Sequence, residues 1–167
     1  MKNSQNKHIS SFTNPEYKFL ISLRKNRNRK SEMKSIAEGY RENNQLIDSR
    51  FDIDTLYICD SFFMGENNEA LVNRFISENI RVVDVSEKIF KEISYRDRPD
   101  GIISLFNTSH QTTPNKVSGP ILIPDQIEKP GNLGTMIRTS KSFGINNIFL
   151  SDEVTDIFNP NVIRSSI

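Results

Sequence analysis

The sequence predicts an α/β protein with two parts: a three-layer α/β domain over residues 1–106, and a single βαβ unit over residues 120–167. Short apolar runs typical of strands alternate with helix-like segments throughout the first part, which is the pattern of a sheet covered by helices on both faces. Residues 107–119, "NTSHQTTPNKVSG", contain almost nothing apolar and many turn formers, so they are predicted to be a linker.

The first predicted helix begins in "NPEYKFLISLRK". Asn14 is placed to cap it and Pro15 occupies its first position, where proline is favoured. The helix is expected to end near Lys25, with the basic run "RKNRNRK" (24–30) as its tail.

The remaining elements of the first part follow in alternation after a short apolar stretch around Ile36. Ser86, just before "EKIFKEI", is a candidate N-cap. The predicted order is a helix over 40–48, a strand over 55–59, a helix over 68–78, a strand over 80–85, a helix over 86–93 and a strand over 101–106.

The second part starts with "GPILIPD" (119–125), which has the composition of a buried strand. A helix follows, and "INNIFL" (145–150) gives a second strand, so that the two strands would be parallel. The helix presents one stripe to the sheet, formed by Leu133, Met136, Ile137, Ser140 and Gly144.

Composition places the chain among ordinary soluble globular proteins, with 167 residues, 35% of them hydrophobic and 26% charged. Its single cysteine, Cys59, excludes an intramolecular disulfide framework and is interpreted as a buried small hydrophobe. With only His8 and His110 besides, no metal cluster is expected. The sequence shows no signal-peptide pattern and no membrane-spanning run, so no membrane association and a cytoplasmic location are expected.

The net charge of +1 hides a strong asymmetry. Residues 1–41 contain ten Lys and Arg against three Glu, a net charge of +7, and the other 126 residues carry −6. Such a basic segment is typical of polyanion binding, although a solvated helix and loop would have the same composition. The candidate RNA-binding residues of this segment are Arg24, Lys25, Arg27, Arg29, Lys30 and Arg41.

The stretch "EKPGNLGTMIRTSKSFG" (128–144) predicts an anion site where a strand turns into a helix. Arg138 lies ~140° around the helix from Leu133, away from the apolar stripe, and Gly134 would leave space under its guanidinium. Asn132 is placed to cap the helix and to hold a ligand. The alternative is a capped helix with a flexible turn and a surface arginine. The stretch matches neither a Walker A loop nor a dinucleotide-binding fingerprint.

The same stretch resembles the first signature of the SpoU/TrmH family of RNA ribose methyltransferases, which runs Pro-Gly-Asn-Leu-Gly-x-x-x-Arg-Thr-Ala, then Phe-Gly, then a strand. "NPNVIRSS" (159–166) is similar to the later Asn-Pro-Lys-x-Val-Arg-x-Ser of that family. Upstream, "RNRKSEMKSIAEGYRENNQLI" (27–47) looks like the start of its substrate-binding domain, which resembles a small ribosomal RNA-binding protein. Here Glu38 and Gly39 match a Glu-Gly pair of the family.

The resemblance implies a knotted α/β catalytic domain of the SPOUT class that forms a homodimer and binds S-adenosylmethionine. The family methylates the 2′-hydroxyl of a ribose, and a substrate-binding domain ahead of the catalytic one favours ribosomal over transfer RNA. Asn132 and Arg138 match the motif's asparagine and catalytic arginine, and Gly134 is a further candidate RNA contact. Because a guanidinium is hard to deprotonate, orientation of a phosphate and stabilisation of the developing alkoxide are favoured for Arg138; a role as base is the alternative.

Some positions depart from the family pattern. Lys129 stands where the family usually has an acid, and residues 140–142, Ser-Lys-Ser, replace Ala-Asp-Ala. The family's second signature, with a glutamate, and its third, Ser-Leu-Asn, have no counterpart. The expectation is therefore a C-terminally truncated or split methyltransferase, whose cofactor-binding residues lie beyond Ile167, on a separate C-terminal fragment in the split case, and which is inactive alone. The alternative function is a non-catalytic RNA-binding module.

Overall fold

The computed structural model describes residues 8–49, 51–108 and 116–167. The chain divides into two compact units, residues 1–108 and residues 109–167. Most of the predicted linker, residues 109–115, lies outside the described residues.

Within the described residues, unit 1 is built on a five-stranded sheet with the strand order β1-β4-β3-β5-β2. The central strand β3 is parallel to β4 and antiparallel to β5, and β5 is also antiparallel to β2. The sheet is therefore mixed. The strands are β1 (His8–Ile9), β2 (Lys34–Glu38), β3 (Ile53–Ile58), β4 (Arg81–Val85) and β5 (Ile102–Asn107).

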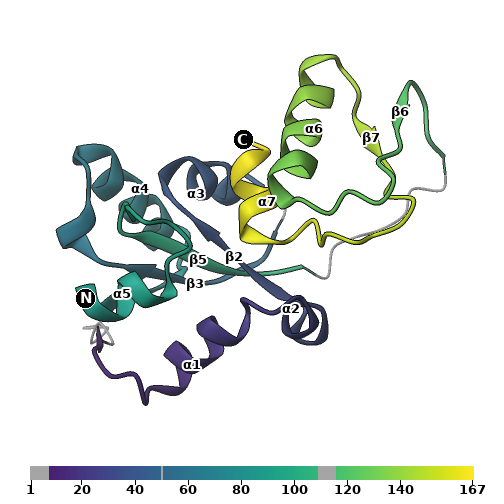
Figure 1. The fold of residues 1–167 in the computed structure, drawn as a ribbon. Coiled ribbons are helices and arrows are strands. Elements are labelled where there is room, and N and C mark those ends of the chain that lie inside the picture. The colour runs from purple at the N-terminus through teal and green to yellow at the C-terminus, as the bar shows by residue number, and fades with distance from the viewer. Residues whose placement is uncertain (1–7, 50, 109–115) are drawn as a thin grey trace. The chain divides into compact units, whose positions relative to one another are not determined.

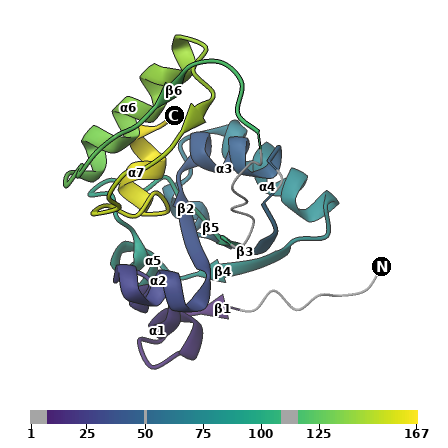
Figure 2. The same ribbon diagram turned by 90° about the vertical axis from the view of Figure 1, so that its right-hand side faces the viewer.

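Helices cover both faces of this sheet, as Figures 1 and 2 show. One apolar cluster joins α1 and α5 to one face of the sheet through Leu20, Leu23 and Phe90. A second cluster, around Leu71 and Phe75, packs α4 on the other face. The helical elements of unit 1 are α1 (Pro15–Ser22), α2 (Asn26–Glu32), α3 (Tyr40–Ile47), the 3-10 turn η1 (Asp60–Phe62), α4 (Glu66–Ser77) and α5 (Glu87–Ile93).

Most elements of unit 1 lie within two residues of their predicted bounds. The predicted cap of α1 is confirmed, because Asn14 Oδ1 accepts a hydrogen bond from the backbone N–H of Glu16 at 2.8 Å. The predicted end of this helix near Lys25 is wrong, because α1 ends at Ser22 and the basic run that follows folds into α2. Ser86 occupies the N-cap position of α5, but its side chain makes no capping hydrogen bond. The short edge strand β1 was not predicted.

Unit 2 contains β6 (Ile121–Leu122), α6 (Pro130–Ser142), β7 (Asn147–Ile148) and α7 (Pro160–Ser165) in its described part. The two strands pair in parallel, with Ile121 opposite Asn147, which confirms the predicted βαβ connection. The helix α7 was not predicted. It begins with the same signal as α1, because Asn159 Oδ1 accepts from the backbone N–H of Asn161 at 2.9 Å and Pro160 follows the cap.

Two predictions for unit 2 are wrong. The segment 119–125 is not a buried strand: pairing covers two residues, and Ile121 and Ile123 are 46% and 61% exposed. Met136 of the predicted stripe is also exposed, whereas Leu133 is buried. The physical reason is that α6 packs against α7, so its buried face is set by a helix partner and not by a broad sheet.

Cys59 is buried at the end of β3, as predicted for a small apolar residue, and burial raises the pKa of its thiol. Over the described part of the chain, no group of three or more His, Cys, Asp or Glu side chains is arranged to hold a metal ion. None of the helices in the same part is both long and apolar enough to span a bilayer.

Candidate functional site

The predicted anion site falls on the first three turns of α6. The N-cap residue of this helix is Lys129, which makes no side-chain capping bond, and Pro130 is the first helical residue. Asn132 is the third helical residue and is exposed. The prediction that Asn132 caps the helix is therefore wrong, since the helix begins two residues earlier, at the proline.

Arg138 lies on the exposed surface of α6, as its distance from the apolar stripe predicted. Its Nη1 donates to the carbonyl oxygen of Ile167 at 3.3 Å. Six residues separate Arg138 from Asn132, so the two are ~9 Å apart along the helix axis and ~120° apart around it. Both side chains of the predicted catalytic pair are thus exposed on one helix, with Asn132 near its start.

Gly134 has a different role from the one predicted. It is buried, and a Cβ built on it would stand 1.9 Å from Ser165 Oγ and 2.6 Å from the carbonyl oxygen of Val162. The predicted open space under the Arg138 guanidinium is therefore filled by α7. Gly134 lets two helix backbones approach closely, and it is not placed to contact RNA.

A shallow pocket of about 450 Å³ opens where the start of α6 meets α7. Arg164 supplies the charged side chain of its lining. Ser165 closes the pocket on the α7 side, with Oγ donating to the carbonyl oxygen of Asn161 at 2.7 Å. The lining residues are Pro130, Gly131, Asn161, Arg164 and Ser165.

The predicted basic cluster of unit 1 separates into two groups. Lys25, Arg27 and Lys30, on α2 or at its start, are exposed, as is Arg41 in the first turn of α3. These four side chains are accessible to a polyanion. Arg24 and Arg29 bond to backbone carbonyl groups of the protein, although Arg24 is itself exposed.

Arg24 ties the start of α2 to the end of α5. Its Nη2 donates to the carbonyl oxygens of Glu92 at 2.6 Å and Ser94 at 2.9 Å, and its guanidinium lies 5.2 Å from the centre of the Tyr95 ring. The cation–π contact adds to the two charge-assisted hydrogen bonds. Arg24 therefore positions the basic helix α2.

Arg29 is only 3% exposed. Its Nη1 donates to the carbonyl oxygens of Leu23 at 2.7 Å and Arg24 at 3.0 Å, which are left at the end of α1. A buried guanidinium held in this way is unavailable to bind RNA. Arg29 is thus wrongly assigned as an RNA contact, because burial was not visible in a run of polar residues.

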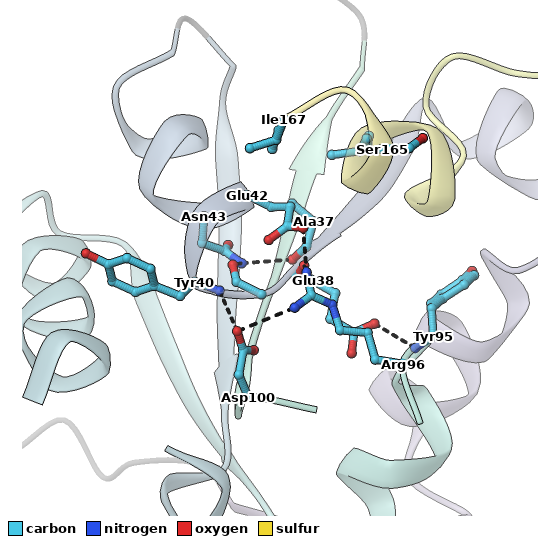
Figure 3. A network of polar contacts seen from close by, with 12 residues as sticks. Ala37, Glu38, Tyr40, Glu42, Asn43, Tyr95, Arg96, Asp100, Ser165 and Ile167 are labelled. Carbon is cyan, nitrogen blue, oxygen red and sulfur yellow. Dashed lines mark hydrogen bonds and ion pairs between the residues drawn. The ribbon is translucent and has the colours of Figure 1, made fainter. Parts of the chain in front are cut away.

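The Glu38–Gly39 pair lies in a buried polar network at the end of β2 (Figure 3). Glu38 accepts hydrogen bonds from the Ser94 hydroxyl and from the Tyr95 backbone N–H, the latter at 2.6 Å. Burial raises the pKa of Glu38, and these hydrogen bonds oppose part of the rise. Gly39 has φ +109°, and a Cβ on it would stand 2.3 Å from Arg96 Nη2, so only glycine fits here.

Arg96 and Asp100 complete this network, and sequence reasoning missed both. Arg96 Nη2 donates to the carbonyl oxygen of Glu38 at 2.8 Å and forms an ion pair with Glu42. Asp100 Oδ2 accepts from the backbone N–H of Tyr40 at 2.7 Å and so caps α3, the helix that carries Arg41. The turn composition of "SYRDRPDG" (94–101) was a signal for a loop, but not for its partners.

Known protein families match both units of the chain. A model described as the MRM3-like substrate binding domain matches residues 14–104, and a model of the SpoU rRNA Methylase family matches residues 119–167. The chain belongs to the SpoU rRNA methylase family. The first match lies within unit 1 and the second within unit 2. The second match includes α6 with Asn132 and Arg138.

Individual relatives of the chain are also described as RNA methyltransferases. The SpoU-family chain is 26% identical over 161 residues to an uncharacterised tRNA/rRNA methyltransferase of Synechocystis, a match that covers 95% of the chain and 57% of the relative. It superposes on the crystal structure of an RNA 2′-O ribose methyltransferase with a TM-score of 0.81 and 26% identity, covering 95% of the chain and 60% of that structure.

An AdoMet-bound rRNA methyltransferase from Sinorhizobium meliloti gives a TM-score of 0.79 at 26% identity, with 95% of the chain and 59% of that structure covered. The α/β fold with parallel strands is therefore shared with solved SpoU-type methyltransferases. The SpoU-family chain spans little more than half the length of these relatives.

Proposed function

We propose that the protein takes part in RNA methylation as a 2′-O-ribose methyltransferase of the SpoU/TrmH type, acting on ribosomal RNA in preference to transfer RNA with S-adenosylmethionine as methyl donor. The observation that carries the proposal is the position of Arg138, exposed on α6 within the segment that the SpoU model matches. The names of the Synechocystis and Sinorhizobium relatives support RNA as the substrate class.

The two parts of the chain have different roles in this proposal. Residues 1–106, a domain of the kind found in small ribosomal proteins, bind the RNA substrate, residues 107–119 are the linker, and residues 120–167 belong to a knotted methyltransferase domain that forms a homodimer. The exposed side chains of Lys25, Arg27, Lys30 and Arg41 contact RNA phosphates. Arg24 and Arg29 hold α2, which presents Arg27 and Lys30.

At the reacting ribose, Arg138 and Asn132 act on the RNA. Attack by a 2′-hydroxyl on a methyl group builds negative charge on that oxygen. A guanidinium that binds the neighbouring phosphate both orients the ribose and stabilises this charge. The Asn132 amide, free of a capping role, supplies a neutral donor and acceptor at the start of the same helix.

The pocket between the start of α6 and α7 does not fit the cationic groups of S-adenosylmethionine. The pocket at α6 and α7 contains Arg164 and, among its described lining residues, no carboxylate. The sulfonium and ammonium groups of this cofactor would meet a like charge there, and only its carboxylate could pair with Arg164. We therefore expect no saturable binding when S-adenosylmethionine is titrated into this chain in a calorimeter, and micromolar binding would contradict this.

Two measurements on the full chain test the function: binding of ribosomal RNA fragments at several salt concentrations, and transfer of a labelled methyl group to that RNA. Arg138→Ala should leave RNA binding largely intact and abolish any methyl transfer. Lys141→Ala, which removes an exposed charge from the same helix, is the matched control.

The alternative is a non-catalytic RNA-binding module, for which the exposed basic side chains of unit 1, among them Arg27 and Arg41, would be sufficient. Salt-dependent RNA binding by the wild type without methyl transfer, also after addition of the C-terminal part of a SpoU-type relative that binds the cofactor, supports this alternative. Transfer that is lost in Arg138→Ala and kept in Lys141→Ala supports the enzyme. Absence of RNA binding by the wild type excludes both functions.

A further inference from the structure

We propose that the pocket between the start of α6 and α7 binds a phosphodiester group of the RNA strand, with Arg164 as its cation. This inference rests on the proposed function, because it adds a second phosphate contact in unit 2 beside Arg138. It concerns the pocket lined by Pro130, Gly131, Asn161, Arg164 and Ser165.

Gly131 is the first observation that points to a ligand. Its φ is not positive, and nothing among the described residues lies within 4 Å of a Cβ built on it. Neither the backbone conformation nor packing in the described chain therefore requires glycine. Gly134, one turn later, shows the opposite case, because its Cβ would collide with α7. The missing side chain of Gly131 keeps the pocket open.

Arg164 is the second observation. It is exposed in the last turn of α7, and no hydrogen bond or ion pair to it is found among the residues that the structure describes. The described lining offers no carboxylate that would pair with it or repel an anion. A guanidinium binds phosphate through two parallel N–H donors, so it suits a phosphodiester better than a lysine would.

The pocket is held by contacts between α6 and α7. Ser165 Oγ donates to the carbonyl oxygen of Asn161 at 2.7 Å and lies 3.4 Å from that of Pro130, so it joins the two helices beside the pocket. The close approach at Gly134 fixes the same pair of helices one turn further on. The backbone of α7 at Arg164 is therefore held beside the start of α6 before any ligand arrives, so that binding has to order only the arginine side chain.

RNA is favoured over a free phosphate because of what surrounds the pocket. Asn132 follows Gly131 directly. Arg138 is seven residues after Gly131, about two turns along α6. A ribose held by this pair belongs to a strand whose adjoining phosphates extend along the helix surface. Gly131 and Arg138 lie ~20° apart around α6, so a strand along this face of the helix can place one of these phosphates in the pocket.

Fluorescence anisotropy with a labelled ribosomal RNA fragment, recorded on the full chain from low to high salt, tests the proposal. Arg164→Gln should weaken binding about tenfold at low salt and reduce the slope of log affinity against log salt by about one. Gly131→Val keeps every charge but fills the pocket, and it should weaken binding by a similar factor. Lys141→Gln, an exposed charge outside the pocket, should have less effect than either.

Circular dichroism and thermal melting of each variant show whether it is folded; if Gly131→Val is not, the comparison of Arg164→Gln with Lys141→Gln decides. Wild-type affinity and slope in a folded Arg164→Gln overturn the inference while the proposed function stands. Equal losses of RNA affinity in Arg164→Gln and Lys141→Gln overturn the inference as well, because binding would then not depend on the position of the charge at the pocket.

Failure of the wild type to bind RNA overturns both proposals. A titration with inorganic phosphate, followed by the NMR signal of the Gly131 amide, separates the two sources of phosphate. A shift that depends on Arg164, together with RNA binding that does not, would assign the pocket to a small phosphate and overturn the RNA contact.

Discussion

Gly134 of α6 and Ser165 of α7 approach so closely that a Cβ on the glycine would stand 1.9 Å from the serine Oγ. The contact joins the two helices that carry Arg138 and Arg164. The glycine at this point of the Pro-Gly-Asn-Leu-Gly motif is therefore explained by helix packing.

Gly134→Ala should destabilise unit 2 by about 1–3 kcal/mol, because the added methyl group must push the α7 backbone away. Hydrogen exchange of the α6 and α7 amides in the full chain measures this locally. Gly131→Ala is the matched control on the same helix: its Cβ meets no described atom, so exchange there should stay the same or slow slightly. Equal protection in the two variants would contradict the packing role of Gly134.

Arg29→Ala should lower the free energy of unfolding of unit 1 by about 2–3 kcal/mol, since it removes two charge-assisted hydrogen bonds, one to the buried carbonyl oxygen of Leu23 and one to the partly buried carbonyl oxygen of Arg24. Urea unfolding followed by circular dichroism is the measurement. Arg27→Ala, two residues earlier and exposed, should change stability by less than ~0.5 kcal/mol. If both variants were equally stable, Arg29 would not anchor α2.

Asp100→Ala should cost about 1–2 kcal/mol, because the Tyr40 backbone N–H at the start of α3 loses its capping acceptor and Arg96 loses a nearby carboxylate. Asp97→Ala removes an exposed acid from the same loop and serves as control. Thermal melts of the two variants give the comparison, and a loss no larger than that of the control would show that α3 does not depend on this cap.

The raised pKa of Glu38 predicts a pH dependence of stability. Below the ordinary pKa of 4.5 the carboxyl is protonated in both the folded and the unfolded state, and its contribution is fully present. As pH rises through the higher folded pKa, the buried carboxyl must ionise, despite the nearby Arg96, and this contribution is lost.

Glu38→Gln should therefore be less sensitive to this rise in pH than the wild type, with the stability difference between the two moving in favour of the glutamine variant. Urea midpoints from pH 4 upward measure it. Glu92→Gln, at an exposed position, controls for general charge effects. A wild type that gains stability relative to Glu38→Gln over the same range would show the opposite sign and contradict a raised pKa of Glu38.

Local signals predicted most of the elements, and long-range contacts account for the failures. An Asn-Pro pair marked the start of α1 correctly, and the same pair at Asn159 and Pro160 was a sufficient signal for α7, although it was not used. The run 24–30 was interpreted as a tail because it contains no apolar residue. It folds as a helix because Arg29 bonds to carbonyl groups that only the end of α1 presents.

In the candidate site, too, local features could be predicted from the sequence and long-range contacts could not. The exposure of Arg138 followed from helical periodicity, a property of the local sequence. The packing role of Gly134 could not be predicted, because it depends on a second helix that contacts it through Val162, 28 residues further along the chain. The pocket at Arg164 exists only where those two helices meet. Likewise, Glu38 and Gly39 were noticed as a pair, whereas their partners Arg96 and Asp100 come from a distant loop.

The strand order of unit 1 also has a consequence for folding kinetics. The first thirty-odd described residues supply both edges of the sheet, with Ile9 of β1 opposite Val85 and Ser35 of β2 opposite Phe106, each pair more than seventy residues apart in sequence. Closing such long loops costs entropy that only the finished pairing repays. The segment β3-α4-β4 has shorter-range contacts, so it is expected to form first. The basic N-terminal segment, although synthesised earliest, then joins the sheet last.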